Sequence, residues 1–320
     1  MIIKKLLRYS GLALAILFIF WIIGVAAVYF LVNVEDIKKF AVTKINENTT
    51  GELSLGEIKL KVFPLVHFEI KDIAFLSSPN FDKKEMFSCK NARLSFNVFT
   101  LIIGKPRITL RLDNPSLDFI SDGKTNNIND AFATEKKKSS QSALTYLFIS
   151  RFIFKINDAS LKYKTPKDFY EIKGLNLYLN VDPVSRDLDL NISTPIDYKK
   201  LDTVIKGDLG LNAKIKVASK ESSEIKLNLD ATKLLINTKS IEKKKGDALK
   251  IVVLAESDLK TSIKIKDLTV TLIEELLKTT GNLSITDPQK ISLKIDFSKN
   301  YDFSNFRKLF KNLSDYKLSG

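Results

Sequence analysis

The stretch Leu175-Asn176-Leu177-Tyr178-Leu179 alternates apolar and polar residues, and this two-residue period decides the fold. Successive side chains of a β-strand point to opposite faces, so each such stretch has one apolar and one polar face. The same alternation recurs at residues 58–62, 66–70, 94–98, 108–112, 117–119, 161–163, 188–192, 215–217, 225–229, 263–265 and 291–297. We therefore predict a mainly β protein whose antiparallel sheet has one wetted face.

Helical spacing is scarce by comparison. Residues 37–45 predict a helix that Gly51 ends, and three short helices are predicted around 144–148, at 272–277 before Gly281, and at 303–313. So few helices cannot cover the apolar faces of about a dozen strands. Two arrangements stay open: two sheets that close on each other as a sandwich, or one long curved sheet with an apolar, groove-like concave face.

The N-terminus predicts a membrane anchor. No charged residue occurs from Tyr9 to Val34, which is long enough for a transmembrane helix. A cleaved signal peptide would have a shorter apolar core and a polar stretch after the cleavage site. Lys4, Lys5 and Arg8 precede the span, so the positive-inside rule places the N-terminus in the cytoplasm and everything after Glu35 outside it.

The rest of the chain divides at one candidate linker. Residues 1–8 form the cytoplasmic N-terminus and 9–34 the transmembrane helix. An N-terminal β region follows at 35–133, then a Lys- and Ser-rich linker at 134–142 and a second β region at 143–320. The sole cysteine, Cys89, excludes an internal disulfide, so burial and backbone pairing must hold the exported fold together.

The charge and the reactive side chains point away from catalysis. The chain has 51 Lys and Arg against 37 Asp and Glu, a net charge of +14. Its basic residues are mostly dispersed lysines, whereas a nucleic-acid site would cluster arginines, so we expect no nucleic-acid partner. His67 is the only histidine and stands at a polar strand position, and no phosphate-binding or nucleophile motif occurs. We expect no enzymatic activity, no metal and no cofactor.

A series of weak motifs nevertheless resembles a known family. After the apolar segment, Thr50-Gly51-Glu52-Leu53 opens strands that end at Phe63-Pro64, as at the start of AsmA-family proteins. Further segments resemble that family in the same order: 68–76, Lys90-Asn91-Ala92-Arg93-Leu94-Ser95-Phe96, 101–108, Asn114-Pro115-Ser116-Leu117-Asp118-Phe119 with Asp122-Gly123, and 156–163. The resemblance covers Met1 to about Leu179 in detail and the remainder only in its general pattern.

The resemblance implies a single-pass protein of the bacterial inner membrane with its C-terminal bulk in the periplasm. AsmA-like proteins are implicated in outer-membrane lipid homeostasis and are related to bridge-like lipid-transfer proteins, whose long β-groove shields acyl chains. The resemblance therefore favours the long curved, groove-like sheet over the sandwich, and a function in binding or conducting phospholipid along that groove. The implied partners are the inner membrane, phospholipids and an outer-membrane or envelope protein. Large family members are longer, so the chain is either a short member or a truncated one.

Lipid-groove candidates are the apolar positions of the matched strands. They are Leu110, Leu112, Leu117, Phe119, Leu161, Tyr163, Leu175, Leu177 and Leu179. A shift of one residue in the alternation would move any of them to the other face. The alternative interpretation is an anchored β-sandwich that acts as a structural or adaptor protein and binds a protein partner.

Overall fold

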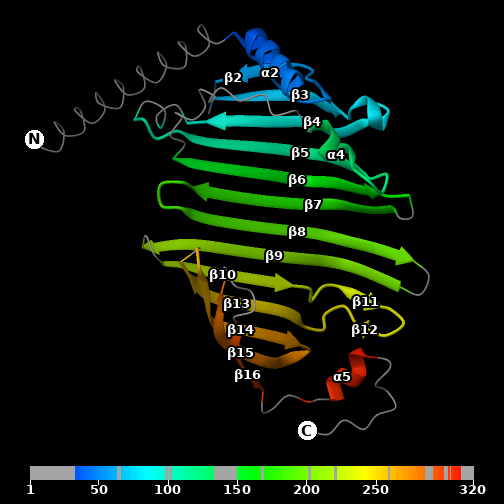
Figure 1. Ribbon diagram of the computed structural model, residues 1–320, viewed down its shortest axis with the longest axis vertical. Coiled ribbons are helices and arrows are strands. Elements are labelled where there is room, and N and C mark those ends of the chain that lie inside the picture. Colours follow the sequence, from blue (N-terminus) through cyan, green and yellow to red (C-terminus); the bar gives the residue numbers. More distant parts are fainter. Residues whose placement is uncertain are drawn as a thin grey trace, which may run out of the picture.

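A computed structural model describes residues 33–310 except 63–65, 98–99, 101–102, 133–149, 167–168, 201–202, 220–221, 259, 285–290, 299–301 and 303. The described strands form a single 16-stranded sheet. Figure 1 shows the strands stacked along the long axis of the molecule, with α2 at one end and α5 at the other. No second sheet faces the first among the described residues, so the open curved sheet is confirmed and the sandwich is wrong.

The strands follow one another across the sheet almost in chain order. The order is β1-β3-β4-β5-β6-β7-β8-β9-β10-β13-β14-β15-β16, with β2 beside β3 and β11 beside β9 and β12. Their bounds are β1 (Glu52–Ser54), β2 (Ile58–Lys61), β3 (Val66–Leu76), β4 (Glu85–Phe96), β5 (Arg107–Ile120), β6 (Arg151–Lys164), β7 (Phe169–Asp182), β8 (Asp187–Lys200), β9 (Thr203–Ser219), β10 (Ser222–Asp230), β11 (Leu235–Asn237), β12 (Glu242–Lys243), β13 (Leu249–Ser257), β14 (Ser262–Leu272), β15 (Glu274–Ser284) and β16 (Ile291–Phe297).

One strand pair departs from the predicted antiparallel sheet. β5 and β6 pair in parallel, from Arg107 opposite Arg151 to Ile120 opposite Lys164. The chain between them is long enough to return to the same end of the sheet, which a parallel pair requires. This connection includes the short helix α4 (Asn127–Ala131), which the alternation did not predict. Because β5 precedes the predicted linker and β6 follows it, one sheet runs through both predicted β regions.

The helices confirm some predictions and correct one. Helix α2 (Val34–Asn48) lies where the first helix was predicted, and the Asn33 side chain accepts hydrogen bonds from the Glu35 and Asp36 amides at its start. Helix α5 (Ser304–Leu309) confirms the last helix in its described part. The helix predicted at 272–277 is wrong, because β14 and β15 meet there in a hairpin with Ile273 at φ 65°. A short apolar run does not distinguish a helix from buried strands.

Several predictions lie outside the described residues. They include the cytoplasmic N-terminus, nearly all of the transmembrane segment, the linker and the helix at 144–148. Within the described part of the chain, no helix combines the length and the hydrophobicity that crossing a bilayer requires.

A small hydrophobic core closes the N-terminal end of the sheet. It consists of Leu53, Phe75, Met86 and Ala131, with Val42 of α2 and Ile128 of α4 packed against it. Gly51 belongs to this corner, because a Cβ there would lie 2.6 Å from the Leu76 carbonyl oxygen. Helices α2 and α4 thus cover only the first strands of the sheet.

Candidate functional site

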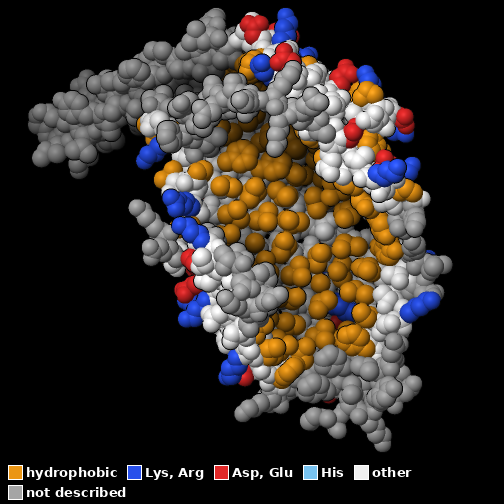
Figure 2. All heavy atoms as spheres, viewed as in Figure 1, with side chains coloured by type: hydrophobic (Ala, Val, Ile, Leu, Met, Phe, Trp, Pro, Cys, Tyr) orange, Lys and Arg blue, Asp and Glu red, His pale blue; other side chains and the backbone are white. Residues whose placement is uncertain are grey.

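One face of the sheet carries apolar side chains from the first strands to the last. Residues directly opposite in neighbouring strands share a face, so the strand registers trace a row across the sheet. This central row consists of Ile58, Ile70, Ala92, Leu112, Ile156, Leu177, Ile192, Leu211, Leu229, Ile251, Val270, Leu277 and Phe297. Every member is apolar. Figure 2 shows these strands as one hollowed field of hydrophobic side chains, with charged side chains gathered at its margins.

The opposite face is polar at the matching positions, apart from the exposed Val252. The adjacent row of registers consists of Lys59, Glu69, Arg93, Arg111, Lys155, Tyr178, Asn191, Asn212, Asn228, Val252, Thr269, Lys278 and Asp296. Ion pairs such as Lys61–Glu69 at 2.8 Å lie on this face. The sheet therefore separates an apolar face from a solvated polar face over its whole length.

The alternation changes phase inside three neighbouring strands, and the backbone accommodates the change. In β5 the apolar positions are Leu110 and Leu112 before Asn114, but Leu117 and Phe119 after it. Asn114 has φ 53°, Asp158 of β6 has φ 56° and Gly174 of β7 has φ 77°. A left-handed residue within a strand changes which face the following side chains occupy. We call these three residues the inversion line.

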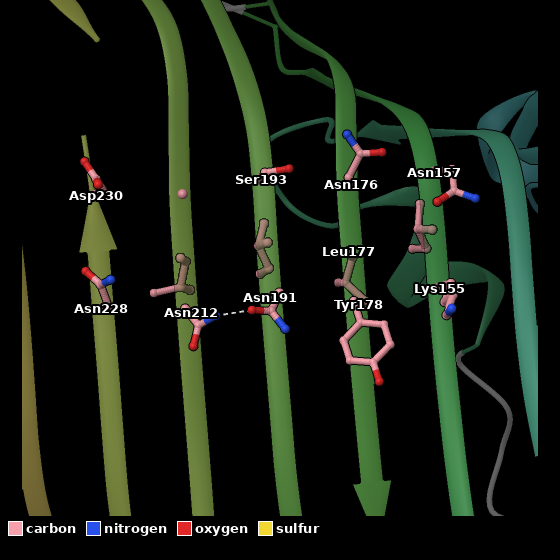
Figure 3. A pocket seen from close by; sticks show the side chains of 14 residues that line it. Lys155, Asn157, Asn176, Leu177, Tyr178, Asn191, Ser193, Asn212, Asn228 and Asp230 are labelled. Atoms are coloured by element: carbon pink, nitrogen blue, oxygen red, sulfur yellow. Dashed lines mark hydrogen bonds between the residues drawn. The ribbon is translucent and has the colours of Figure 1, made fainter. Parts of the chain in front are cut away.

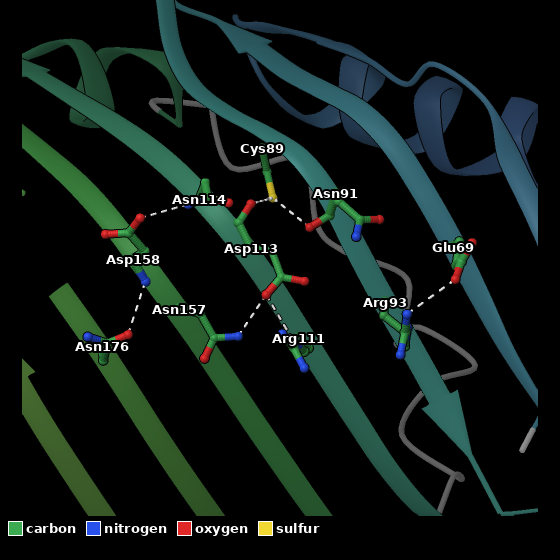
Figure 4. A network of polar contacts seen from close by, with 10 residues as sticks. All are labelled: Glu69, Cys89, Asn91, Arg93, Arg111, Asp113, Asn114, Asn157, Asp158 and Asn176. Carbon is green, nitrogen blue, oxygen red and sulfur yellow. Dashed lines mark hydrogen bonds and ion pairs between the residues drawn. The ribbon is translucent and has the colours of Figure 1, made fainter. Parts of the chain in front are cut away.

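Polar side chains hold the inversion line in place (Figure 4). Asn114 Nδ2 donates to Asp158 Oδ2 at 2.9 Å, and the Asp158 amide donates to Asn176 Oδ1 at 3.1 Å. Beside them, Asn157 Nδ2 and Arg111 Nε donate to Asp113 Oδ1 at 2.7 and 2.8 Å. These contacts satisfy the polar groups where the regular strand pattern is interrupted.

The same network sets the protonation of Asp113. Partial burial works against ionisation of its carboxyl group, but the hydrogen bonds from Asn157 and Arg111 outweigh that effect and hold its pKa below the ordinary value. Asp113 is therefore an ionised acceptor within the polar face.

All nine predicted groove residues lie on the apolar face. Leu112 and Leu177 belong to the central row, and Leu110 and Leu179 flank it opposite Phe154. On the other side of the inversion line, Leu117 lies opposite Leu161, and Phe119 opposite Tyr163. Leu175 lies opposite Ala159, on the strand face of Leu161. Leu175 and Leu177 are two residues apart on β7, which places both groups on one face.

The sequence prediction left out the apolar face of the later strands. Leu211, Leu229, Ile251, Val270 and Leu277 continue the central row through β9, β10, β13, β14 and β15. The alternation of residues 225–229 is a visible signal for Leu229, whereas Leu277 was assigned to a helix. At the last strand, β16, the row ends with Phe297, whose exposed fraction is 58%.

Aromatic residues mark one margin of the apolar face. The rings of Phe119 and Tyr163 stack with centroids 5.0 Å apart, and Tyr170 lies 6.1 Å from both Tyr163 and Tyr198. These residues come from adjacent ends of β5, β6, β7 and β8. A tyrosine places its ring against apolar material and its hydroxyl toward water, so this margin suits the boundary between a lipid chain and solvent.

The arrangement can bind long apolar molecules. Among the described residues, no group of three or more His, Cys, Asp or Glu side chains could hold a metal ion. The described helices contact β1, β2, β5 and β12, which leaves the middle of the apolar face without a covering helix in the described structure.

The chain matches a known protein family. The family model described as the AsmA family matches residues 3–242, which extends beyond the segment where the sequence motifs were recognised. No curated protein matches the chain. Because the family match spans three quarters of the sequence, the chain belongs to the AsmA family.

Proposed function

We propose that this protein binds phospholipids through their acyl chains along the apolar face and conducts them through the cell envelope, in support of outer-membrane lipid homeostasis. The observation that carries the proposal is the central row, which stays apolar through every strand of the sheet path from β3 to β16. Membership of the AsmA family supports an envelope-associated role.

The physical properties of the face suit movement as well as binding. Removing a methylene group from water contributes about 0.8 kcal/mol, so acyl chains are held by many small increments. The described central row has only apolar side chains, so none of them can fix a chain at one position by a hydrogen bond. Neighbouring strands are about 4.8 Å apart, so the thirteen strands of the main path give a conduit of roughly 60 Å.

The N-terminal apolar segment and the excess of basic residues support a position at the inner membrane. We propose that residues 9–34 anchor the protein in the inner membrane with residues 1–8 in the cytoplasm and the sheet in the periplasm. The basic excess would favour anionic lipid surfaces. An outer-membrane or envelope protein would receive the lipid at the far end. The proposed role is binding and conduction, with no chemical reaction.

Mass spectrometry of copurified lipid tests the proposal. We expect the exported ectodomain, residues 35–320, purified without detergent, to carry phospholipid in at least stoichiometric amount. Leu229→Asp and Leu177→Asp, which place a charge on the apolar face, should remove most of that lipid while the circular dichroism spectrum is retained.

Asn228→Asp is the matched control, because Asn228 neighbours Leu229 on β10 but points to the polar, exposed face. Lipid content should be unchanged in this variant. A cooperatively folded, lipid-free ectodomain would overturn the proposal and favour the adaptor role, which crosslinking to a protein partner would then examine.

A further inference from the structure

A trough crosses the polar face on the back of the lipid-binding surface (Figure 3). It has a volume of about 470 Å³ and runs across β6, β7, β8, β9 and β10. One wall is the register row Lys155, Tyr178, Asn191, Asn212 and Asn228, and the other consists of Asn157, Asn176, Ser193, Gly210 and Asp230. The volume falls within the range of small-molecule sites, about 300–1,000 Å³.

Five of the fourteen residues that line this trough are asparagines. Asn212 Nδ2 donates to Asn191 Oδ1, and Asn191 Nδ2 donates to Asp189 at 3.1 Å, so the amides form a connected, oriented series. Asn228 extends the series by one strand, is exposed, and makes no side-chain hydrogen bond within the described structure. Asn157 and Asn176 of the other wall already bond to Asp113, to the Asp158 amide and to the Gly174 carbonyl oxygen. The Asn228 amide and the Asn212 Oδ1 atom make no other side-chain bond among the described residues, which leaves both donors and acceptors for a ligand.

The two charged side chains that line the trough already have partners within the protein, which favours an uncharged ligand. Lys155 Nζ lies over the Tyr178 ring, 5.5 Å from its centroid, and Asp230 pairs with Lys250 at 3.3 Å. No arginine lines the trough to recognise a phosphate or carboxylate. A peptide could not add as a strand, because each of the five strands already pairs on both sides.

We propose that this trough binds a neutral glycan chain. Amide side chains match the donors and acceptors of sugar hydroxyl and acetamido groups. The walls repeat at the spacing of the strands, about 4.8 Å, over roughly 20 Å, so the trough suits a chain of several sugar units. A sheet that carries lipid on one face would thereby be attached to a polysaccharide through the other.

Gly210 provides a direct test. A Cβ at this position would meet only the Asp230 carbonyl oxygen at 3.9 Å, so the space beside Gly210 is open and Gly210→Val places a side chain in the trough. The full chain in lipid nanodiscs, which avoids sugar-based detergents, is titrated calorimetrically with chitotetraose and with maltotetraose. We expect saturable binding of at least one, weakened about tenfold or more by Gly210→Val and by Asn228→Ala.

The controls separate this site from the lipid surface. Ser292→Val, another exposed polar-face position on β16, should bind glycan like the unaltered protein. Lipid copurification should be the same in Gly210→Val as in the unaltered ectodomain, so failure of one proposal does not decide the other. Asn228→Ala removes an exposed side chain, and an unchanged circular dichroism spectrum shows that the sheet is retained. Binding of neither sugar, or equal binding by both trough variants, would overturn the proposal.

Discussion

At the scale of single residues, the inversion line has the strongest effect on the apolar face. If β5 were a regular strand, Leu110 and Leu112 would lie on the opposite face from Leu117 and Phe119. Each of the first two residues is an odd number of positions from each of the last two, and side chains alternate between the faces. Asn114 tolerates the required left-handed conformation better than most residues. The apolar face therefore depends on one backbone conformation in each of β5, β6 and β7.

Replacing Asn114 tests this dependence. Asn114→Val should lower the free energy of unfolding by roughly 1–2 kcal/mol, because a β-branched residue is strained at positive φ. Asn114→Gly also loses the hydrogen bond to Asp158, but glycine adopts positive φ without strain. This variant should therefore lower the free energy of unfolding less than Asn114→Val does. Urea denaturation of both variants gives the comparison, and equal losses would show that the side-chain bond alone matters.

Asp113 makes a pH-dependent contribution next to this line. Its pKa is lowered in the folded protein, so its stabilising effect is complete above the unfolded value of about 3.9 and is lost as the pH falls through the lower folded value. Asp113→Asn should therefore be less stable than the unaltered protein at pH 7, and the difference should shrink toward pH 3. Denaturant titrations at several pH values measure it, and a constant difference would contradict this assignment.

At the scale of elements, β11 and β12 interrupt the regular order of the sheet. The first part of β9 pairs with β11 and the later part with β10, so the sheet divides beside the turn at residues 231–234. Lys243 of β12 is 2% exposed, and its Nζ donates to the carbonyl oxygens of Thr232, Leu234 and Lys244 at 3.1, 2.7 and 3.2 Å. One buried ammonium thus joins the hairpin to the turn.

Lys243→Met should loosen this junction. The variant keeps the apolar stem but removes the donor of the Leu234 carbonyl oxygen, whereas the Thr232 and Lys244 carbonyl oxygens keep the Gly246 and Asp247 amides as donors. Leaving this buried carbonyl unpaired should cost about 1–3 kcal/mol of unfolding free energy. Limited proteolysis should then cleave residues 231–247 faster. Lys244→Met, a neighbouring exposed lysine, is the matched control and should change neither quantity.

At the scale of the whole molecule, the described residues cover the two ends of the sheet to different extents. The N-terminal core covers the first strands, whereas Leu293, Ile295 and Phe297 of β16 have exposed fractions of 45%, 51% and 58%. A conduit requires that lipid pass every intervening strand. A charged side chain placed between the two ends should therefore change the amount of lipid at one end more than at the other.

Crosslinking from both ends tests conduction as distinct from binding. A photoreactive residue at Leu112 and another at Phe297 should each capture phospholipid in cells. With Leu229→Asp between them, capture at Phe297 should fall severalfold more than capture at Leu112, because a charge on the apolar path is expensive to desolvate. Equal capture at both positions would show that lipid does not travel along the row.

The sequence by itself determined the strand content, the apolar and polar faces and the absence of recognisable catalytic motifs, because a period of two residues is a local property of the chain. It also identified the family through the order of its motifs. Leu277 was misassigned because a short apolar run carries no information about pairing.

Only the tertiary structure decided between an open sheet and a sandwich, since that choice depends on which strands meet. It also made β5 and β6 parallel and brought Leu112 and Leu117 to one face. The amide trough, too, exists only through strand register, which places Asn191, Asn212 and Asn228 side by side although they are 21 and 16 residues apart in the chain.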